Sequence, residues 1–136
     1  MNNIINTNKY QSTNKYQSTN NPNKYNIHQR MFDFVVSVLK IINNINRNPN
    51  NSTIIAQLID SVTSAGANDQ EADGVTTPKD FIHCYTIVRK ELKETYYWIN
   101  LIKALEYKTK HHLDDILQEN LELINIISAI IHKSRK

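Results

Sequence analysis

The apolar residues from position 27 onward recur at intervals of three and four, which is the spacing of one face of an α-helix. The first series consists of Met31, Val35, Val38, Ile42 and Ile45, and Phe34 and Ile41 widen it. Segment 43–51 interrupts the series with clustered asparagines and Pro49, which are typical of turns. The pattern therefore predicts a first helix that begins near Ile27 and ends within 43–51.

A second apolar series follows at Ile54, Ile55, Leu58, Ile59 and Val62. Asn51 or Ser52 suits the cap of this helix, because a short polar side chain can accept a hydrogen bond from the first turn. The second half of the segment consists largely of small residues, which let a neighbouring backbone approach closely; they are Ser61, Ser64, Ala65, Gly66 and Ala67. We predict that the helix ends near 72–74, with Gly74 as a left-handed cap.

The third segment has the clearest start signal. Thr77 suits the N-cap, Pro78 the first helical position and Asp80 the third. The apolar series that follows alternates between intervals of four and three over about 28 residues, or about 42 Å of helix. Its members are Phe81, Tyr85, Val88, Leu92, Thr95, Ile99 and Ile102, with Tyr96, Tyr97 and Trp98 on the flanks.

The fourth segment begins near Thr109 or Lys110 and is more apolar than one core requires. Its main face comprises Leu113, Leu117, Leu121, Ile124, Ile127 and Ile131, and Ile116, Ile126 and Ile130 add a second face. We expect part of this surface to face another subunit.

Four amphipathic segments with short connections predict an all-α, antiparallel up-down-up-down four-helix bundle over residues 27–136. Residues 1–26 predict a disordered tail, since they are polar, hold nine of the 19 asparagines and repeat the unit NKYQST at 8–13 and 14–19. Three Lys-Tyr pairs in this tail could meet phosphates and stack on bases. The alternative is a replication-slippage repeat with no binding role.

The net charge of +3 belongs entirely to residues 1–27, because residues 28–136 contain 13 basic and 13 acidic residues. The pI of 8.9 is therefore weak support for nucleic-acid binding by the body. The single cysteine, Cys84, excludes an intramolecular disulfide and a cysteine-based zinc site. Its apolar neighbours favour a buried, inert thiol. We expect a reducing cytoplasm, with no secretory signal and no membrane span.

Two carboxylates, Glu91 and Glu94, share one face of the third helix and could act as acid and base or bind a metal. A di-metal bundle would need Glu-x-x-His on two helices, and the sequence has no such motif. His111 and Asp115, four residues apart, are a second metal alternative. We expect instead a structural polar cluster between the second and third helices, formed by Asn68, Glu71, Glu91 and Glu94. We predict no catalytic residue, no metal and no cofactor.

The basic residues of the body form groups that are candidates for binding nucleic acid. They are Arg89, Lys90 and Lys93 on the third helix, Lys103, Lys108 and Lys110 around the third loop, and Lys133, Arg135 and Lys136 at the C-terminus. In an antiparallel bundle the last two groups lie at opposite ends. A ring of subunits would repeat each group around one rim. The alternative is an ordinary solvated helical surface.

Several short sequences of the second and third segments occur in a characteristic order. They are Gln57-Leu58, Ser61, Thr63-Ser64-Ala65-Gly66-Ala67-Asn68, Glu71-Ala72, Lys79-Asp80-Phe81-Ile82, Arg89-Lys90-Glu91, Glu94-Thr95, Tyr97-Trp98 and Leu101. In order and spacing they resemble the four-helix-bundle proteins encoded in intervening sequences of 23S ribosomal RNA genes. The resemblance covers roughly residues 27–134, and the stretch from Glu122 to Ile131 is similar to the last helix of that family.

The resemblance implies a four-helix bundle that commonly assembles as a barrel-like homopentamer, without an established enzymatic activity. It also implies an association with RNA or another nucleic acid. A related group serves as the accessory protein of diversity-generating retroelements, in which a basic pentamer binds the reverse transcriptase and its RNA. The neutral body of this chain departs from that group.

The sequence as a whole predicts a cytoplasmic, non-enzymatic homo-oligomer, with a pentamer favoured, that binds RNA, DNA or a ribonucleoprotein partner. The alternative is a protein-interaction scaffold for a reverse transcriptase of a diversity-generating retroelement. A metalloenzyme is the third hypothesis.

Overall fold

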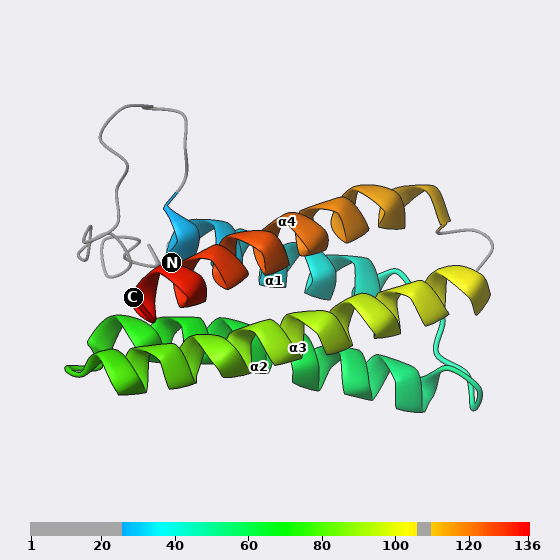
Figure 1. The fold of residues 1–136 in the computed structure, drawn as a ribbon. Coiled ribbons are helices and arrows are strands. Elements are labelled where there is room, and N and C mark those ends of the chain that lie inside the picture. The colour runs from blue at the N-terminus through cyan, green and yellow to red at the C-terminus, as the bar shows by residue number, and fades with distance from the viewer. Residues whose placement is uncertain (1–25, 106–109) are drawn as a thin grey trace, which may run out of the picture.

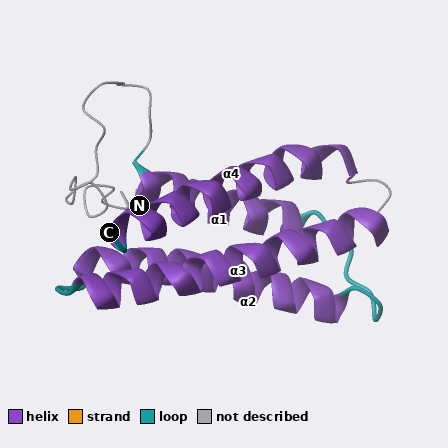
Figure 2. Cartoon of the chain, viewed as in Figure 1, coloured by secondary structure: helices purple, strands orange, loops and turns teal. Residues whose placement is uncertain are grey.

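The computed structural model describes residues 26–105 and 110–136, and within them all regular secondary structure is helical (Figure 2). The helices are α1 (Ile27–Asn43), α2 (Ser52–Gly74), α3 (Pro78–Leu105) and α4 (Lys110–Ser134). Each helix runs opposite to the one before it (Figure 1), and α1 and α3 both pack against α2 and α4. The predicted all-α four-helix bundle is confirmed, while the predicted tail at 1–26 lies outside the described residues except for Asn26.

The first helix begins where the polar segment meets the apolar series. The side chain of Asn26 caps α1 by accepting a hydrogen bond from the backbone N–H of Gln29 at 2.7 Å. Four residues of the predicted face are fully buried, and they are Met31, Phe34, Val38 and Ile42. Burial of this face against the other helices stabilises α1, since a single helix of this length is marginal in water.

The asparagines after α1 form a hydrogen-bonded turn. Asn51 is buried, its Oδ1 accepts from the backbone N–H of Asn48 at 2.8 Å, and its Nδ2 donates to the carbonyl of Asn46 at 2.9 Å. Asn51 does stand at the N-cap position of α2, but its side chain makes no capping hydrogen bond there. The clustered asparagines therefore satisfy the loop backbone, and the position of the turn is as predicted.

The predicted left-handed cap at Gly74 is wrong. Helix α2 continues through Gly74, no described glycine has a positive φ, and the chain leaves the helix with Val75 extended at φ −78° and ψ 151°. A short extended connection is favoured here because a residue that precedes a proline, as Thr77 does, avoids the helical region. Thr77 and Asp80 then form the predicted start of α3: Thr77 Oγ1 accepts from the Asp80 N–H at 3.1 Å and donates to Asp80 Oδ2 at 2.8 Å.

The predicted inner face of α4 is correct at both ends of the helix and wrong in the middle. Leu121 is 39% exposed and Ile124 only partly buried, whereas Asn120 and Leu123 are fully buried. The inner line thus runs through Leu117, Asn120 and Leu123. A prediction made from apolar residues alone assigns a buried asparagine to the surface. It therefore chose Leu121 as the inner residue in place of Asn120.

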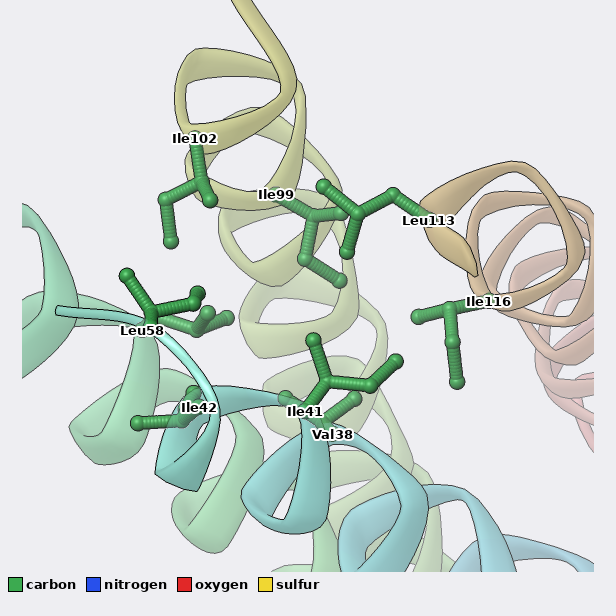
Figure 3. A pocket seen from close by; sticks show the side chains of 9 residues that line it. Val38, Ile41, Ile42, Leu58, Ile99, Ile102, Leu113 and Ile116 are labelled. Atoms are coloured by element: carbon green, nitrogen blue, oxygen red, sulfur yellow. The ribbon is translucent and has the colours of Figure 1, made fainter. Parts of the chain in front are cut away.

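A small cavity lies where α1 and α3 end and α4 begins (Figure 3). All four helices contribute to its lining, which consists of Val38, Ile41, Ile42, Ile45, Leu58, Ile99, Ile102, Leu113 and Ile116. These side chains are hydrocarbon and point toward one another (Figure 3), so they offer no donor, acceptor or nucleophile to a substrate. The cavity is apolar and partly open, and we assign it no chemical role.

The two glycines of α2 give a matched test of how closely α1 approaches it. A Cβ at Gly66 would lie 3.0 Å from Cγ2 of Val35 on α1, whereas a Cβ at Gly74 would meet nothing within 4 Å. We expect Gly74→Ala to raise the free energy of unfolding by about 0.5 kcal/mol, because alanine loses less conformational entropy in a helix.

Gly66→Ala should raise the free energy of unfolding by less than Gly74→Ala does, or should lower it, because Val35 must move to make room for the new Cβ. Adding Val35→Ala should restore the gain in a double-mutant cycle followed by urea unfolding. Equal stabilisation by both alanines would mean that α1 and α2 are not in close contact at Gly66.

Candidate nucleic-acid interface

Three of the basic residues of α3, Arg89, Lys90 and Lys93, lie within little more than one helical turn. Lys90 and Lys93 are exposed, Arg89 is half-buried, and the side chain of Lys90 is 68% accessible to solvent. The Nζ atom of Lys90 lies 3.9 Å from Glu91 Oε1, a surface ion pair that lowers the local positive charge and contributes little to stability. These three side chains therefore present positive charge on the outer side of α3.

The predicted group around the third loop differs from the α3 group. Lys103 makes an ion pair with Asp114 of α4, so its charge is compensated within the bundle. Lys108 and the side chain of Lys110 lie outside the described residues. Within the described part of the chain, this group contributes no uncompensated positive charge.

The C-terminal group is exposed at Lys133, Arg135 and Lys136. Figure 1 shows the C-terminus at the end of the bundle where α3 begins, opposite to the end where α3 finishes. Lys103, the member of the loop group whose side chain is described, lies in the last turn of α3 and therefore at that opposite end. Lys133 also lies in the last turn of α4, where a cation is favoured by the helix dipole.

The four residues of the predicted polar cluster form no common hydrogen-bonded group among the described contacts. Asn68 Nδ2 donates to the Ser64 carbonyl at 2.9 Å, while Glu71 and Glu94 are exposed. Burial raises the pKa of Glu91 above its ordinary value, and the nearby Glu94 carboxylate raises it further. The buried polar contacts between the helices come from other residues.

A buried network joins three helices through Asp69. Asp69 Oδ2 lies 2.9 Å from His28 Nδ1 of α1, and its Oδ1 accepts a hydrogen bond from the Tyr85 hydroxyl of α3 at 3.0 Å. The Asp69 side chain is only 3% exposed. The hydrogen bond to Asp69 raises the pKa of His28 above its ordinary value, although burial opposes this effect, and Asp73 adds to it at 3.5 Å. Sequence reasoning missed Asp69, although its spacing from Ala65 and Ala72 places it on the buried line of α2.

Two further buried polar residues explain breaks in the apolar pattern. Thr95, the one polar member of the α3 seam, has its Oγ1 2.9 Å from Ser61 Oγ and 2.8 Å from the Glu91 carbonyl. Asn120 of α4 donates from Nδ2 to the Leu92 carbonyl at 3.0 Å. These contacts fix how α2 and α4 align with α3.

Arg30 of α1 is committed to partly exposed ion pairs with α4. Its Nε donates to Glu119 Oε1 at 2.6 Å, its Nη2 donates to Glu119 Oε2 at 3.0 Å, and Nη2 also contacts Glu122. The hydrogen bond with Glu119 raises the pKa of Arg30. This bidentate pair ties α1 to α4, so Arg30 is not a candidate for phosphate binding.

An exposed aromatic ring lies next to the basic residues of α3. Tyr97 is 56% exposed, and its ring meets that of Trp98 edge to face, with centroids 5.0 Å apart and an angle of 67°. Trp98 packs against the core. The sequence placed both residues on the flanks of α3 and gave Tyr97 no role, although its spacing from Lys90 and Lys93 was visible.

The remaining sequence predictions concern the cysteine thiol, metal sites and membrane spans. Cys84 is buried, and burial raises its pKa, as the nearby carboxylates of Glu71 and Asp80 also do. Among the side chains that the structure describes, no group of three or more His, Cys, Asp or Glu is arranged to hold a metal ion. The alternative site at His111 and Asp115 is not covered by this statement, because the side chain of His111 lies outside the described residues. None of the helices in this part of the chain combines the length and apolarity needed to cross a membrane.

Comparison with known proteins gives one family and one similar structure of note. The family model of the 23S rRNA-intervening sequence protein matches residues 23–129. A crystal structure of a protein of unknown function from the S23 ribosomal protein family, from Bacteroides thetaiotaomicron VPI-5482, is similar with a TM-score of 0.71 and 27% identity. The similarity covers 78% of this chain and 98% of that one. No curated protein matches the chain.

Proposed function

The chain belongs to the family of 23S rRNA-intervening sequence proteins, and we propose that it is a non-enzymatic homo-oligomer that binds RNA. The observation that carries this proposal is the group Arg89, Lys90 and Lys93 on the outer side of α3. Unlike Arg30 and Lys103, which are paired with acids of α4, these residues leave positive charge facing solvent. Phosphates of RNA are the matching anions.

The neutral body does not argue against this proposal, because its charges are unevenly divided among the helices. Helix α2 contains four acidic residues and no lysine or arginine, whereas α3 contains five basic and three acidic residues. A phosphate chain can therefore lie along α3 and avoid α2. Local potential, rather than net charge, sets the strength of such an interaction.

Self-association is the second part of the proposal, with a pentamer favoured by the family resemblance. Apart from Tyr97, the described surface exposes large apolar side chains on three helices, and they are Phe32, Leu105 and Leu121. A ring would repeat the α3 basic group on every subunit, and simultaneous contacts would raise the affinity for one RNA. Light scattering after size-exclusion chromatography tests this part, and a strict monomer at micromolar concentration would contradict it.

The alternative is a scaffold that binds the reverse transcriptase of a diversity-generating retroelement. The exposed apolar residues also suit a protein partner. A scaffold of this kind would co-purify with the reverse transcriptase and retain no RNA. An adjacent reverse-transcriptase gene would support the scaffold, and a position inside a ribosomal RNA gene would support the RNA-binding proposal.

Charge reversal on α3 tests the RNA-binding proposal. We expect the double substitution Lys90→Glu and Lys93→Glu to weaken binding of a labelled mixed-sequence RNA at least about tenfold in low salt, because two phosphate contacts become repulsive. The slope of log affinity against log salt should fall by about two. Fluorescence anisotropy across a salt series measures both quantities.

Lys40→Glu is the matched control, because Lys40 is also exposed but lies in the last turn of α1. It should change the affinity much less than the α3 double substitution. Absence of binding by the unmodified protein in low salt, or an affinity indifferent to salt, would refute the proposal. Equal losses from both variants would place the interface elsewhere.

A further inference from the structure

We propose that the outer face of α3 binds single-stranded nucleic acid, with an unpaired base stacked on Tyr97 and neighbouring phosphates bound by Lys90 and Lys93. The inference rests on the proposed function and names its substrate class. It adds a stacking contact to a site so far described by charge alone.

The three side chains form one row along α3. Lys90, Lys93 and Tyr97 are separated by three and four residues, so they point to the same side of the helix. The row is about 10 Å long at 1.5 Å per residue. One row of contacts suits one strand.

Tyr97 has the properties of a stacking platform. More than half of its surface is exposed, and the edge-to-face contact with Trp98 holds the ring from one side. Trp98 is itself held by the core, so the pair limits the freedom that Tyr97 would lose on binding. Stacking on an aromatic side chain is available to every unpaired base.

Charge alone is a weak basis for binding at this row. Glu94 is exposed beside Lys93 and lowers the local positive charge, and Glu91 lies 3.9 Å from Lys90. A stacking contact supplies attraction that does not depend on this small charge excess. In a duplex the bases are already stacked and paired, so Tyr97 has no free base to meet. The row therefore favours single strands over duplexes.

The chain contains its own reporter for this contact. Trp98 is the single tryptophan of the sequence, and its ring lies 5.0 Å from that of Tyr97. A base stacked on Tyr97 changes the surroundings of Trp98. We expect oligouridylate to change the tryptophan emission of the unmodified protein saturably, at the concentrations that change anisotropy.

The decisive variants are Tyr97→Leu and Tyr97→Phe in the full chain. Phenylalanine keeps the aromatic face and should bind labelled oligouridylate within about twofold of the unmodified protein. Leucine keeps an apolar side chain without a ring, so it should bind at least about fivefold more weakly. Its salt slope should be unchanged, since no phosphate contact is lost. Binding of a duplex RNA should be equal in both variants.

The outcomes separate this inference from the proposed function. If Tyr97→Leu binds oligouridylate normally while the Lys90 and Lys93 reversals weaken binding, stacking is refuted and RNA binding stands. If the unmodified protein binds no RNA, both fail. If Tyr97→Leu changes the oligomeric state in size-exclusion chromatography, this face is a protein interface and the inference fails. Unchanged Trp98 emission at saturation would also refute it, whether or not the leucine variant folds.

Discussion

Replacing Asp69 with alanine is expected to lower the free energy of unfolding by about 3 kcal/mol, the largest loss from one polar side chain in the described bundle. The substitution removes the 2.9 Å contact with His28 and the 3.0 Å hydrogen bond from Tyr85. Both partners were positioned by this carboxylate, and hydrogen bonds to a charged group in a buried site are worth more than neutral ones. Urea unfolding followed by circular dichroism measures the loss.

Two controls separate the network from a general effect of removing an acid from α2. Asp60→Ala should change the stability little, because Asp60 is exposed. Tyr85→Phe removes one of the two contacts and should cost about 1 kcal/mol. In a double-mutant cycle, Asp69→Ala should lower the free energy of unfolding by a smaller amount in the Tyr85→Phe background than in the unmodified chain. A loss from Asp69→Ala as small as that from Asp60→Ala would contradict the network.

Helix α3 was predictable because its determinants are local. The Thr77 and Asp80 cap uses residues three apart, and the seam from Tyr85 to Ile102 repeats with the helical period. The buried polar residues were not predictable in the same way. The spacing of Asp69 from Ala65 and Ala72 places it on the buried line of α2, but its partner His28 lies 41 positions away. The sequence therefore does not show which groups satisfy its carboxylate. The error at Gly74 has a local cause, because the chain before Pro78 favours an extended connection over a left-handed cap.

The candidate interface was also predictable where its determinants are local and unpredictable where residues distant in the sequence meet. That Arg89, Lys90 and Lys93 share a stretch of helix could be predicted from the spacing. The compensation of the Lys103 charge could not be predicted, because its partner Asp114 lies on the next helix. Arg30 was never a candidate in the sequence, and its partly exposed pair with Glu119 compensates its charge between α1 and α4. A basic residue that pairs with an acid of another helix cannot be told from one that is free to bind phosphate until the positions of both side chains are known.

Asn120 provides the second large expected effect, and its sign is opposite to that of Asp69. Asn120 is fully buried on the inner line of α4, with one hydrogen bond to the Leu92 carbonyl, and its Oδ1 has no hydrogen-bond partner among the described residues. A buried acceptor without a partner costs about 1 to 3 kcal/mol. Asn120→Leu should therefore raise the free energy of unfolding by about 1 kcal/mol, after allowance for the lost hydrogen bond and the larger side chain.

The physical reason for a gain is that Leu92 does not depend on Asn120. The Leu92 carbonyl lies inside α3, where it can accept from the backbone N–H four residues later, so the substitution leaves it satisfied. Asn120→Asp is the matched control with nearly the same shape, and it should lower the stability because it buries an ionised carboxylate. If Asn120→Leu destabilises the chain as well, the single hydrogen bond outweighs the desolvation of the amide. A stabilising result would mean that Asn120 serves to fix the alignment of α4 on α3 at a cost in stability, as buried polar residues do in coiled coils.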